Sequence, residues 1–381
     1  MLNPGREIPV PVDSPRPIRP AGVDKTFDSP KMKPIKWFAA IGVVCLLVQT
    51  EVFTRWILSG PRPTAAGPDQ MPAWMSILAQ FMQWMGPVLM IVTAYFVVWK
   101  PWRRDGRISL YGMAFFGVLT SYWLDTAANY FNHVYTINPV FVNFGSWNNF
   151  MPFWVSPNAE HIAEPFLFFL PIYTFGIVWP AIGFCALMRY IRARRPGISN
   201  IRLIGVITGI ATVAMFILDG IIYVRTGMYA FAGTIPSVTL FAGKYYQYPL
   251  YQPIACAFLY WVLPASIYFF RNDRGETLIE RGVTSMKVSS RQSAWLRFLA
   301  VAAMFNIIQF TYSLVLAVIS VLPTFTWAHD IVEHQSYLRN ELCGEGTSYA
   351  CPAGDSPIPR IGGAHVDPHG HLVNPTGTQH P

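Results

Sequence analysis

Apolar residues occur in long runs that short polar segments separate. A bilayer core about 30 Å thick needs about 20 apolar residues per helix, and seven runs reach that length. They cover residues 37–58, 74–99, 109–131, 163–190, 201–224, 250–270 and 295–322. The pattern therefore predicts an all-α, polytopic membrane helix bundle with about seven transmembrane helices.

Positive charges fall mainly in alternate loops of this arrangement. They concentrate before the first run and between the second and third, the fourth and fifth, and the sixth and seventh runs. The other loops and the tail hold only Arg55, Arg62, Arg225, Lys244, Arg339 and Arg360. Because Lys and Arg are enriched in cytoplasmic loops, the sequence predicts a cytoplasmic N-terminus and an outer C-terminus.

Polar segments flank and interrupt the predicted bundle. Residues 1–35 are Pro-rich and predict a disordered cytoplasmic leader, and residues 336–381 predict a disordered outer tail. The transmembrane domain between them, residues 36–335, includes an outer lid or re-entrant segment near 132–162. Cys343 and Cys351 lie on the outer, oxidising side, and the sequence leaves open whether they form a disulfide.

Composition agrees with a bilayer location. Hydrophobic residues make up 52% of the chain and charged residues only 13%, about half the charged share of a soluble domain. So few charges cannot cover a water-soluble surface. The net charge of +8 comes from Lys and Arg in the predicted cytoplasmic loops, so it does not indicate nucleic acid as a partner. The expected partner is the lipid bilayer. The oligomeric state stays open.

Apart from Glu164 at the start of the fourth run, three acids lie inside the predicted helices, all toward their outer ends. They are Glu51, Asp125 and Asp219. Ionisable groups inside a membrane are functional candidates by default, and their common depth predicts one polar chamber that opens outward. Glu51 is four residues before Arg55, which favours a structural ion pair for that acid.

The third apolar run ends in a polar stripe. Asp125, Asn129 and His133 are spaced i, i+4 and i+8, so a continuous helix places them on one face. An acid, an amide and an imidazole on one face can hold a hydroxyl or ketone and transfer protons. The alternative is a polar seam that joins neighbouring helices.

The stretch from Asn132 to His161 contains no Lys or Arg but many aromatic and amide side chains. Irregular backbone at membrane depth is allowed where it lines a cavity, so a lid over a substrate is one interpretation. Asn143, Trp147 and Asn148 are its candidate substrate contacts. An interfacial aromatic belt is the alternative for the tryptophans.

Further acids surround the start of the fourth apolar run. Glu160, His161 and Glu164 precede Pro165, which suits the first turn of a helix. In the fifth run, Asp219 shares a helical face with Tyr223, four positions later. The candidate catalytic residues are Asp125, His133, Glu164 and Asp219, and the candidate substrate-binding residues are Asn129, Asn143, Trp147, Asn148, Glu160, His161 and Tyr223.

Common cofactor motifs are missing from the sequence. Outside the His-containing tail it has no His-x-x-x-His pattern, and it has no His-Glu-x-x-His or Cys-x-x-Cys pattern, no Gly-rich phosphate loop and no Gly-x-Ser-x-Gly elbow. We therefore predict no metal and no cofactor, although a mixed His/carboxylate site on the outer side stays open. The pattern favours acid/base chemistry on a hydrophobic or amphipathic small molecule.

One region of the chain resembles a known family. Asp125-Thr-Ala-Ala-Asn-Tyr-Phe-Asn-His133, Asn143-Phe-Gly-Ser-Trp147, Pro152, Ser156-Pro157 and Glu164-Pro165 resemble the AveC-like spirocyclases. These are bacterial integral membrane proteins, widespread in actinobacteria. The resemblance implies a multi-pass plasma-membrane cyclase of secondary metabolism that closes a dihydroxy-ketone polyketide to a spiroketal, in some members with dehydratase activity.

The residues suit such a reaction. We expect Asp125 to act as the acid, His133 or Glu164 as the base, and Asn129 and Asp219 as positioning groups. Two alternatives remain. One is a lipid or small-molecule transporter or binding protein without catalytic activity, and the other is a cyclase or dehydratase that acts on a lipid or terpenoid.

Overall fold

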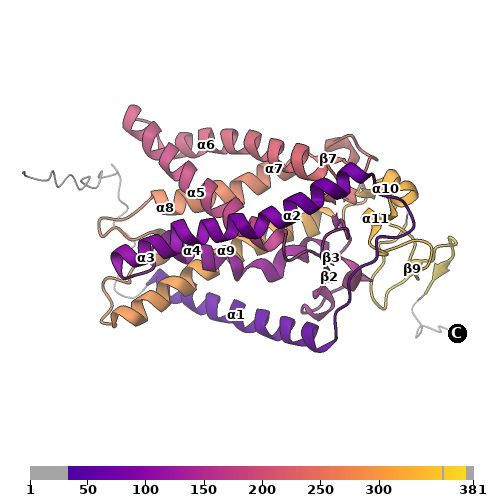
Figure 1. Cartoon of the computed structure of the whole chain (residues 1–381), viewed down its shortest axis with the longest axis horizontal. Helices are drawn as coiled ribbons and strands as arrows, with labels where there is room; N and C mark the ends of the chain where they lie inside the picture. Colours follow the sequence, from indigo (N-terminus) through magenta and orange to yellow (C-terminus); the bar gives the residue numbers. More distant parts are fainter. Residues whose placement is uncertain (1–32, 354–355, 375–381) are drawn as a thin grey trace, which may run out of the picture.

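The computed structural model describes residues 33–353 and 356–374. Within these ranges, six helices are long and apolar enough to cross a membrane, which fits a membrane protein. They are α1 (Pro34–Leu58); α2 (Ala73–Ala94) with η2 (Tyr95–Trp99) and α3 (Lys100–Asp105); α5 (Phe169–Arg194); α6 (Asn200–Met215) with η6 (Phe216–Val224); α7 (Tyr251–Cys256) with η8 (Ala257–Val262) and α8 (Leu263–Phe269); and α9 (Ser290–Ile319). They run along the long axis of the molecule (Figure 1). Residues 1–32 of the predicted leader lie outside the described residues.

The third predicted span differs from the sequence-based expectation. Instead of one helix over 109–131, the chain forms α4 (Leu110–Leu119) and then a 3-10 helix, η3 (Tyr122–Asn129). The hydroxyls of Thr120 and Ser121 donate to backbone carbonyls three residues back, at 2.6 and 2.7 Å, where α4 ends. The expected single helical face of Asp125, Asn129 and His133 is therefore wrong, and seven membrane-spanning helices are not confirmed.

Polar side chains on α9 satisfy the backbone that this break exposes. The amide nitrogens of Asn306 and Gln309 donate to the carbonyls of Thr120 and Leu124, at 3.1 and 3.3 Å. Ser313 also donates to the Leu124 carbonyl, at 3.2 Å. Irregular backbone in an apolar environment needs such partners, so α9 stabilises the position of η3.

A loop cap covers one end of the bundle (Figure 1). We define it as residues 130–168, 225–250 and 320–353. Four short antiparallel pairs join its segments: β1 (Thr136–Ile137) with β4 (Tyr229–Ala230), β2 (Phe144–Gly145) with β3 (Ala163–Glu164), β5 (Gly233–Thr234) with β8 (Thr326–Trp327), and β6 (Thr239–Leu240) with β7 (Tyr248–Pro249). Its short helices are η4 (Asn148–Phe150), η5 (Ala159–His161), η7 (Pro236–Val238), α10 (His329–His334) and α11 (Ser336–Arg339). At the other end lies η9 (Leu278–Glu280). The predicted lid lies within the cap, and much of it is buried.

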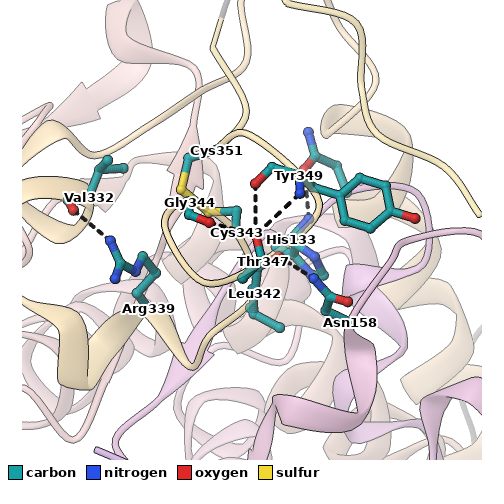
Figure 2. The surroundings of a disulfide bond; sticks show 11 residues. His133, Asn158, Val332, Arg339, Leu342, Cys343, Gly344, Thr347, Tyr349 and Cys351 are labelled. Carbon is teal, nitrogen blue, oxygen red and sulfur yellow. Dashed lines mark hydrogen bonds between the residues drawn. A yellow bond between two sulfur atoms is a disulfide. The ribbon is translucent and has the colours of Figure 1, made fainter. Parts of the chain in front are cut away.

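The described residues after 335, which are 336–353 and 356–374, are folded, contrary to the disorder predicted for them. The Asn340 side chain accepts from the N–H of Ile137 at 3.2 Å and donates to its carbonyl at 2.9 Å. A disulfide joins Cys343 and Cys351, with His133 among its surroundings (Figure 2). A hairpin of β9 (His365–Val366) and β10 (Leu372–Val373) follows. The amide pairing attaches this segment to β1, and the disulfide closes a short loop within it.

We predict that Gly42→Ala destabilises the bundle. Gly42 lies where α1 packs on α9, and an added Cβ would overlap the backbone carbonyl of Leu299. Overpacking of this kind costs about 1–3 kcal/mol, so thermal unfolding in detergent should occur at a lower temperature. Gly209→Ala in α6 is the control, because nothing lies within 4 Å of its added Cβ. Equal melting temperatures for the two variants would contradict close α1–α9 packing.

Candidate functional site

A cavity of about 420 Å³ lies among α5, η6 and η8. This volume is within the range of small-molecule sites, about 300–1,000 Å³. Its wall is mostly apolar and aromatic, and none of its lining residues is Lys, Arg or His. The polar members of the lining are Asp125, Asp219, Gln252, Tyr135, Tyr173, Tyr223, Tyr229, Tyr260 and Tyr312.

The three helices around the cavity all depart from regular α-helical geometry there. In α5, Pro180 has no N–H to donate to the carbonyl of Gly176, which instead accepts from the Trp261 indole at 2.7 Å. The segments η6 and η8 are π-helical. Such segments are frequent at functional sites, and the η6 segment carries Asp219 at the cavity wall.

Asp125 reaches the cavity from η3. Its side chain is buried, and the Tyr173 hydroxyl donates to its Oδ1. Gln309 donates to the Tyr173 oxygen at 3.2 Å and accepts from the Tyr260 hydroxyl at 2.6 Å. Among the described residues, Oδ2 of Asp125 has no hydrogen-bond partner. This carboxyl group thus has one donor and one free oxygen.

Asp219 has a richer set of partners. It accepts from the hydroxyls of Tyr229 and Tyr248, the latter at 2.8 Å, and from the Gln252 amide at 3.2 Å. The Gln252 oxygen accepts in turn from Tyr312 at 2.9 Å. Because Tyr229 and Tyr248 belong to β4 and β7, the loop cap supplies two of the three donors.

The cap also connects the two acidic sides of the cavity. Tyr135 donates to the backbone carbonyl of Asp125, and its ring centroid is 6.3 Å from that of Tyr229. Pairing of β1 with β4 keeps these tyrosines on adjacent chain segments. The sequence related Asp125 and Asp219 only through their similar predicted depth in the membrane. In the structure both line one cavity, next to the β1–β4 pair.

Glu164 is buried but does not line the cavity. Its Oε2 accepts from the Tyr122 hydroxyl at 2.9 Å, and Oε1 has no partner among the described residues. Burial raises the pKa of Glu164 well above its usual value, and the charge of Asp125 raises it further. The structure thus places a second buried acid behind the Asp125 side of the site.

His133 lies in the cap, away from the cavity wall. Its ring packs edge-on against Trp327, with centroids 5.9 Å apart, and is 1% exposed. Burial lowers the pKa of His133 to about 4, and the carbonyl of Pro157 opposes this shift only in part. A neutral imidazole packed in this way supports the cap.

Two predicted substrate contacts are cap supports. Asn129 accepts from the backbone N–H groups of Val134 and Tyr135, at 2.7 and 3.0 Å, and so turns the chain after η3. Asn143 accepts from the N–H of Thr64 at 2.9 Å and donates to two carbonyls of its own loop. Neither residue lines the cavity.

Trp147 and Asn148 are also buried outside the cavity. The Trp147 indole donates to the Trp123 carbonyl at 2.6 Å, and Asn148 accepts from Thr126 at 2.6 Å. These bonds attach the lid segment to η3, which carries Asp125.

Glu160 and His161 lie nearer the surface, apart from the cavity. Glu160 accepts from Asn149 at 2.5 Å, and His161 is 3.6 Å from the carboxylate of Glu341. Of the predicted binding residues, only Tyr223 lines the cavity. No hydrogen bond of its hydroxyl occurs within the described part of the chain, so this group is free to meet a ligand.

Sequence reasoning missed most of the polar lining. Tyr173, Tyr260, Tyr312 and Gln252 sit inside apolar runs, where they resemble ordinary packing residues. Polar groups at membrane depth were the available signal. Across residues 33–353 and 356–374, no group of three or more His, Cys, Asp or Glu residues could hold a metal ion.

Comparison with protein families identifies the chain. Residues 102–337 match the family described as Spirocyclase AveC-like. The match covers more than half of the chain, which therefore belongs to the AveC-like spirocyclase family. No curated protein and no solved structure matches the chain.

We predict that His133 makes stability depend on pH. As the pH falls from about 6.5 toward 4, the unfolded chain gains a proton on His133 that the folded chain does not accept. The folded state therefore loses about 2 kcal/mol between about pH 6.5 and pH 5 through this group. Melting temperatures in detergent at these pH values should fall less for His133→Phe, which keeps an aromatic ring. Parallel pH profiles of the two proteins would contradict this role.

Proposed function

From its membership in the AveC-like spirocyclase family, we propose that this chain is a membrane-embedded enzyme that closes rings by acid/base dehydration. The cavity is its active site, and the substrate is a polyketide-like dihydroxy ketone that becomes a spiroketal. The observation that carries this proposal is the pair of buried carboxyl groups, Asp125 and Asp219, in one apolar cavity without a basic lining residue.

The different partners of the two acids suggest different roles. Three donors stabilise the ionised form of Asp219, whereas Asp125 has a single donor and an unpartnered oxygen. Carboxyl groups in contrasting environments can divide acid and base functions. We assign Asp125 as the acid and Asp219 as the base, in place of His133 and Glu164, which do not line the cavity.

The chemistry balances with these two groups. One substrate hydroxyl adds to the ketone and gives a hemiketal. Asp125 then protonates the hemiketal hydroxyl, the C–O bond breaks, water leaves, and the carboxylate of Asp219 stabilises the resulting oxocarbenium ion. The second hydroxyl attacks this carbon and transfers its proton to Asp219. Return of that proton to Asp125 completes the cycle, so one water is the only by-product.

The cavity wall contributes positioning. An apolar, aromatic surface favours a folded chain with its hydroxyls near the ketone and excludes water that would trap the cation. The free hydroxyl of Tyr223 is suited to hold a substrate oxygen. Because the cap supplies the donors Tyr229 and Tyr248, it holds Asp219 in place during the reaction.

We place the protein in the bacterial plasma membrane with the loop cap outside. The disulfide between Cys343 and Cys351 lies in the cap and suits an oxidising compartment. The basic loops lie at the other end of the helices, as expected for a cytoplasmic side.

The proposal predicts that Asp125→Asn and Asp219→Asn each slow ring closure by about 10²–10⁴-fold, the usual contribution of a positioned acid or base. Purified protein in lipid vesicles is incubated with a dihydroxy-ketone polyketide, and mass spectrometry follows the loss of one water. Glu51→Gln is the control, because that carboxylate pairs with Arg55 at 3.2 Å on the surface and lies outside the cavity.

Wild-type turnover that persists in both Asn variants would contradict the assigned roles. Binding of the compound without any loss of water, seen as a raised melting temperature, would instead favour a binding protein or transporter.

A further inference from the structure

The loop cap closes the cavity on its own side. Phe231, the cavity residue that follows β4, is 1% exposed, and its carbonyl accepts from the Gln247 amide at 2.7 Å. A second layer lies over this segment, because β8 pairs with β5 and the N–H of Ala328 donates to the carbonyl of Ala232 at 2.7 Å. The buried Phe231 therefore separates the cavity from this part of the cap.

The flank of the cavity is more open. Ile172 and Phe175 of α5 and Leu218 of η6 line the cavity, yet all three are only partly buried. Trp179, also in the lining, is 40% exposed. These residues are apolar and belong to two helices of membrane-spanning length.

That flank faces the hydrocarbon of a bilayer. On η6, the residues beside Leu218 that do not line the cavity, Ile217 and Ile221, are 49% and 51% exposed. Exposed isoleucines on a membrane-spanning helix contact lipid chains. The partly buried Leu218 therefore lies at the border between lipid and cavity.

One side of this border is fixed by a hydrogen bond. The Trp179 indole donates to the Thr93 hydroxyl of α2 at 2.9 Å. The interruption of α5 by Pro180 lies next to it, with the Gly176 carbonyl bound to Trp261. Hydrogen bonds to α2 and to Trp261 thus fix α5 around Gly176 and Trp179. The side chains of Ile172, Phe175 and Leu218 are apolar and form no hydrogen bonds, so they can change rotamer.

We propose that the substrate enters and leaves the cavity sideways, from the bilayer hydrocarbon between α5 and η6, and is therefore a largely apolar, membrane-dissolved molecule. This inference rests on the proposed function and specifies the physical state of its substrate. Lateral entry lets an apolar chain reach Asp125 and Asp219 without passing through water. It also leaves the cap closed, so the hydrogen bonds from Tyr229 and Tyr248 to Asp219 need not break.

Cys256 offers a native probe of this route, because it is a free cysteine in the cavity lining. With Cys45→Ser and Cys185→Ser as background, we would measure labelling of Cys256 in lipid vesicles by mass spectrometry. The apolar reagent N-phenylmaleimide should label it, and a charged, membrane-impermeant methanethiosulfonate should not label it from either side. Leu218→Trp should slow the apolar reagent by about tenfold, which corresponds to about 1.4 kcal/mol on the entry barrier.

Ile221→Trp is the matched control, because it adds the same bulk on the lipid side of η6 without touching the cavity. Equal slowing by both variants, or labelling by the charged reagent, would overturn the lateral route. So would an absence of apolar labelling in the folded protein when denatured protein reacts fully. Labelling needs no catalysis, so lateral labelling without ring closure would reject the proposed function and leave the route standing.

Discussion

The hydrogen bonds from α9 to η3 are the constraint on which the site depends. A chain that breaks a helix inside an apolar bundle exposes carbonyls, and each unsatisfied one costs several kcal/mol. Asn306, Gln309 and Ser313 occupy one face of α9 and bind the carbonyls of Thr120 and Leu124. With these partners the third segment can end its α-helix early and present Asp125 at the cavity. The same Gln309 also joins the tyrosines beside that acid.

Tyrosines of the cap form hydrogen bonds that also shape the cavity. Tyr229 and Tyr248 stabilise short strands of the cap and donate to Asp219, while Tyr135 links the cap to η3. Damage to the cap therefore changes the partners of the acid as well as the fold. Asn129, a predicted substrate contact, and His133, a predicted catalytic residue, also belong to this arrangement, because both support cap loops beside the cavity. At the α5–η6 flank, the side chains of Ile172, Phe175 and Leu218 are apolar and take no part in these hydrogen bonds, so they can change rotamer while Tyr173 and Asp219 keep their partners.

Much of the plan was readable from the sequence. Six apolar runs correspond to long helices, and the depth argument selected Asp125 and Asp219, which share the cavity. The resemblance carried by the motifs between Asp125 and Pro165 is confirmed by the family match. The break at Thr120 was hidden, because a hydroxyl that binds a carbonyl one turn back also occurs in continuous helices. The folded tail was missed because Asn340 pairs with Ile137, which is far away in the sequence, and no local pattern indicates such a contact.

The amide of Gln309 gives the bonds near Asp125 a polarity. Its nitrogen faces the Leu124 carbonyl, which can only accept, so its oxygen must receive the proton of Tyr260. The same nitrogen donates to the Tyr173 oxygen, and the Tyr173 hydroxyl donates to Oδ1 of Asp125. While Tyr173 donates to Oδ1, the proton of a neutral Asp125 lies on Oδ2, which has no partner among the described residues. A glutamine on a neighbouring helix thereby selects which of two chemically equivalent oxygens is able to give up a proton.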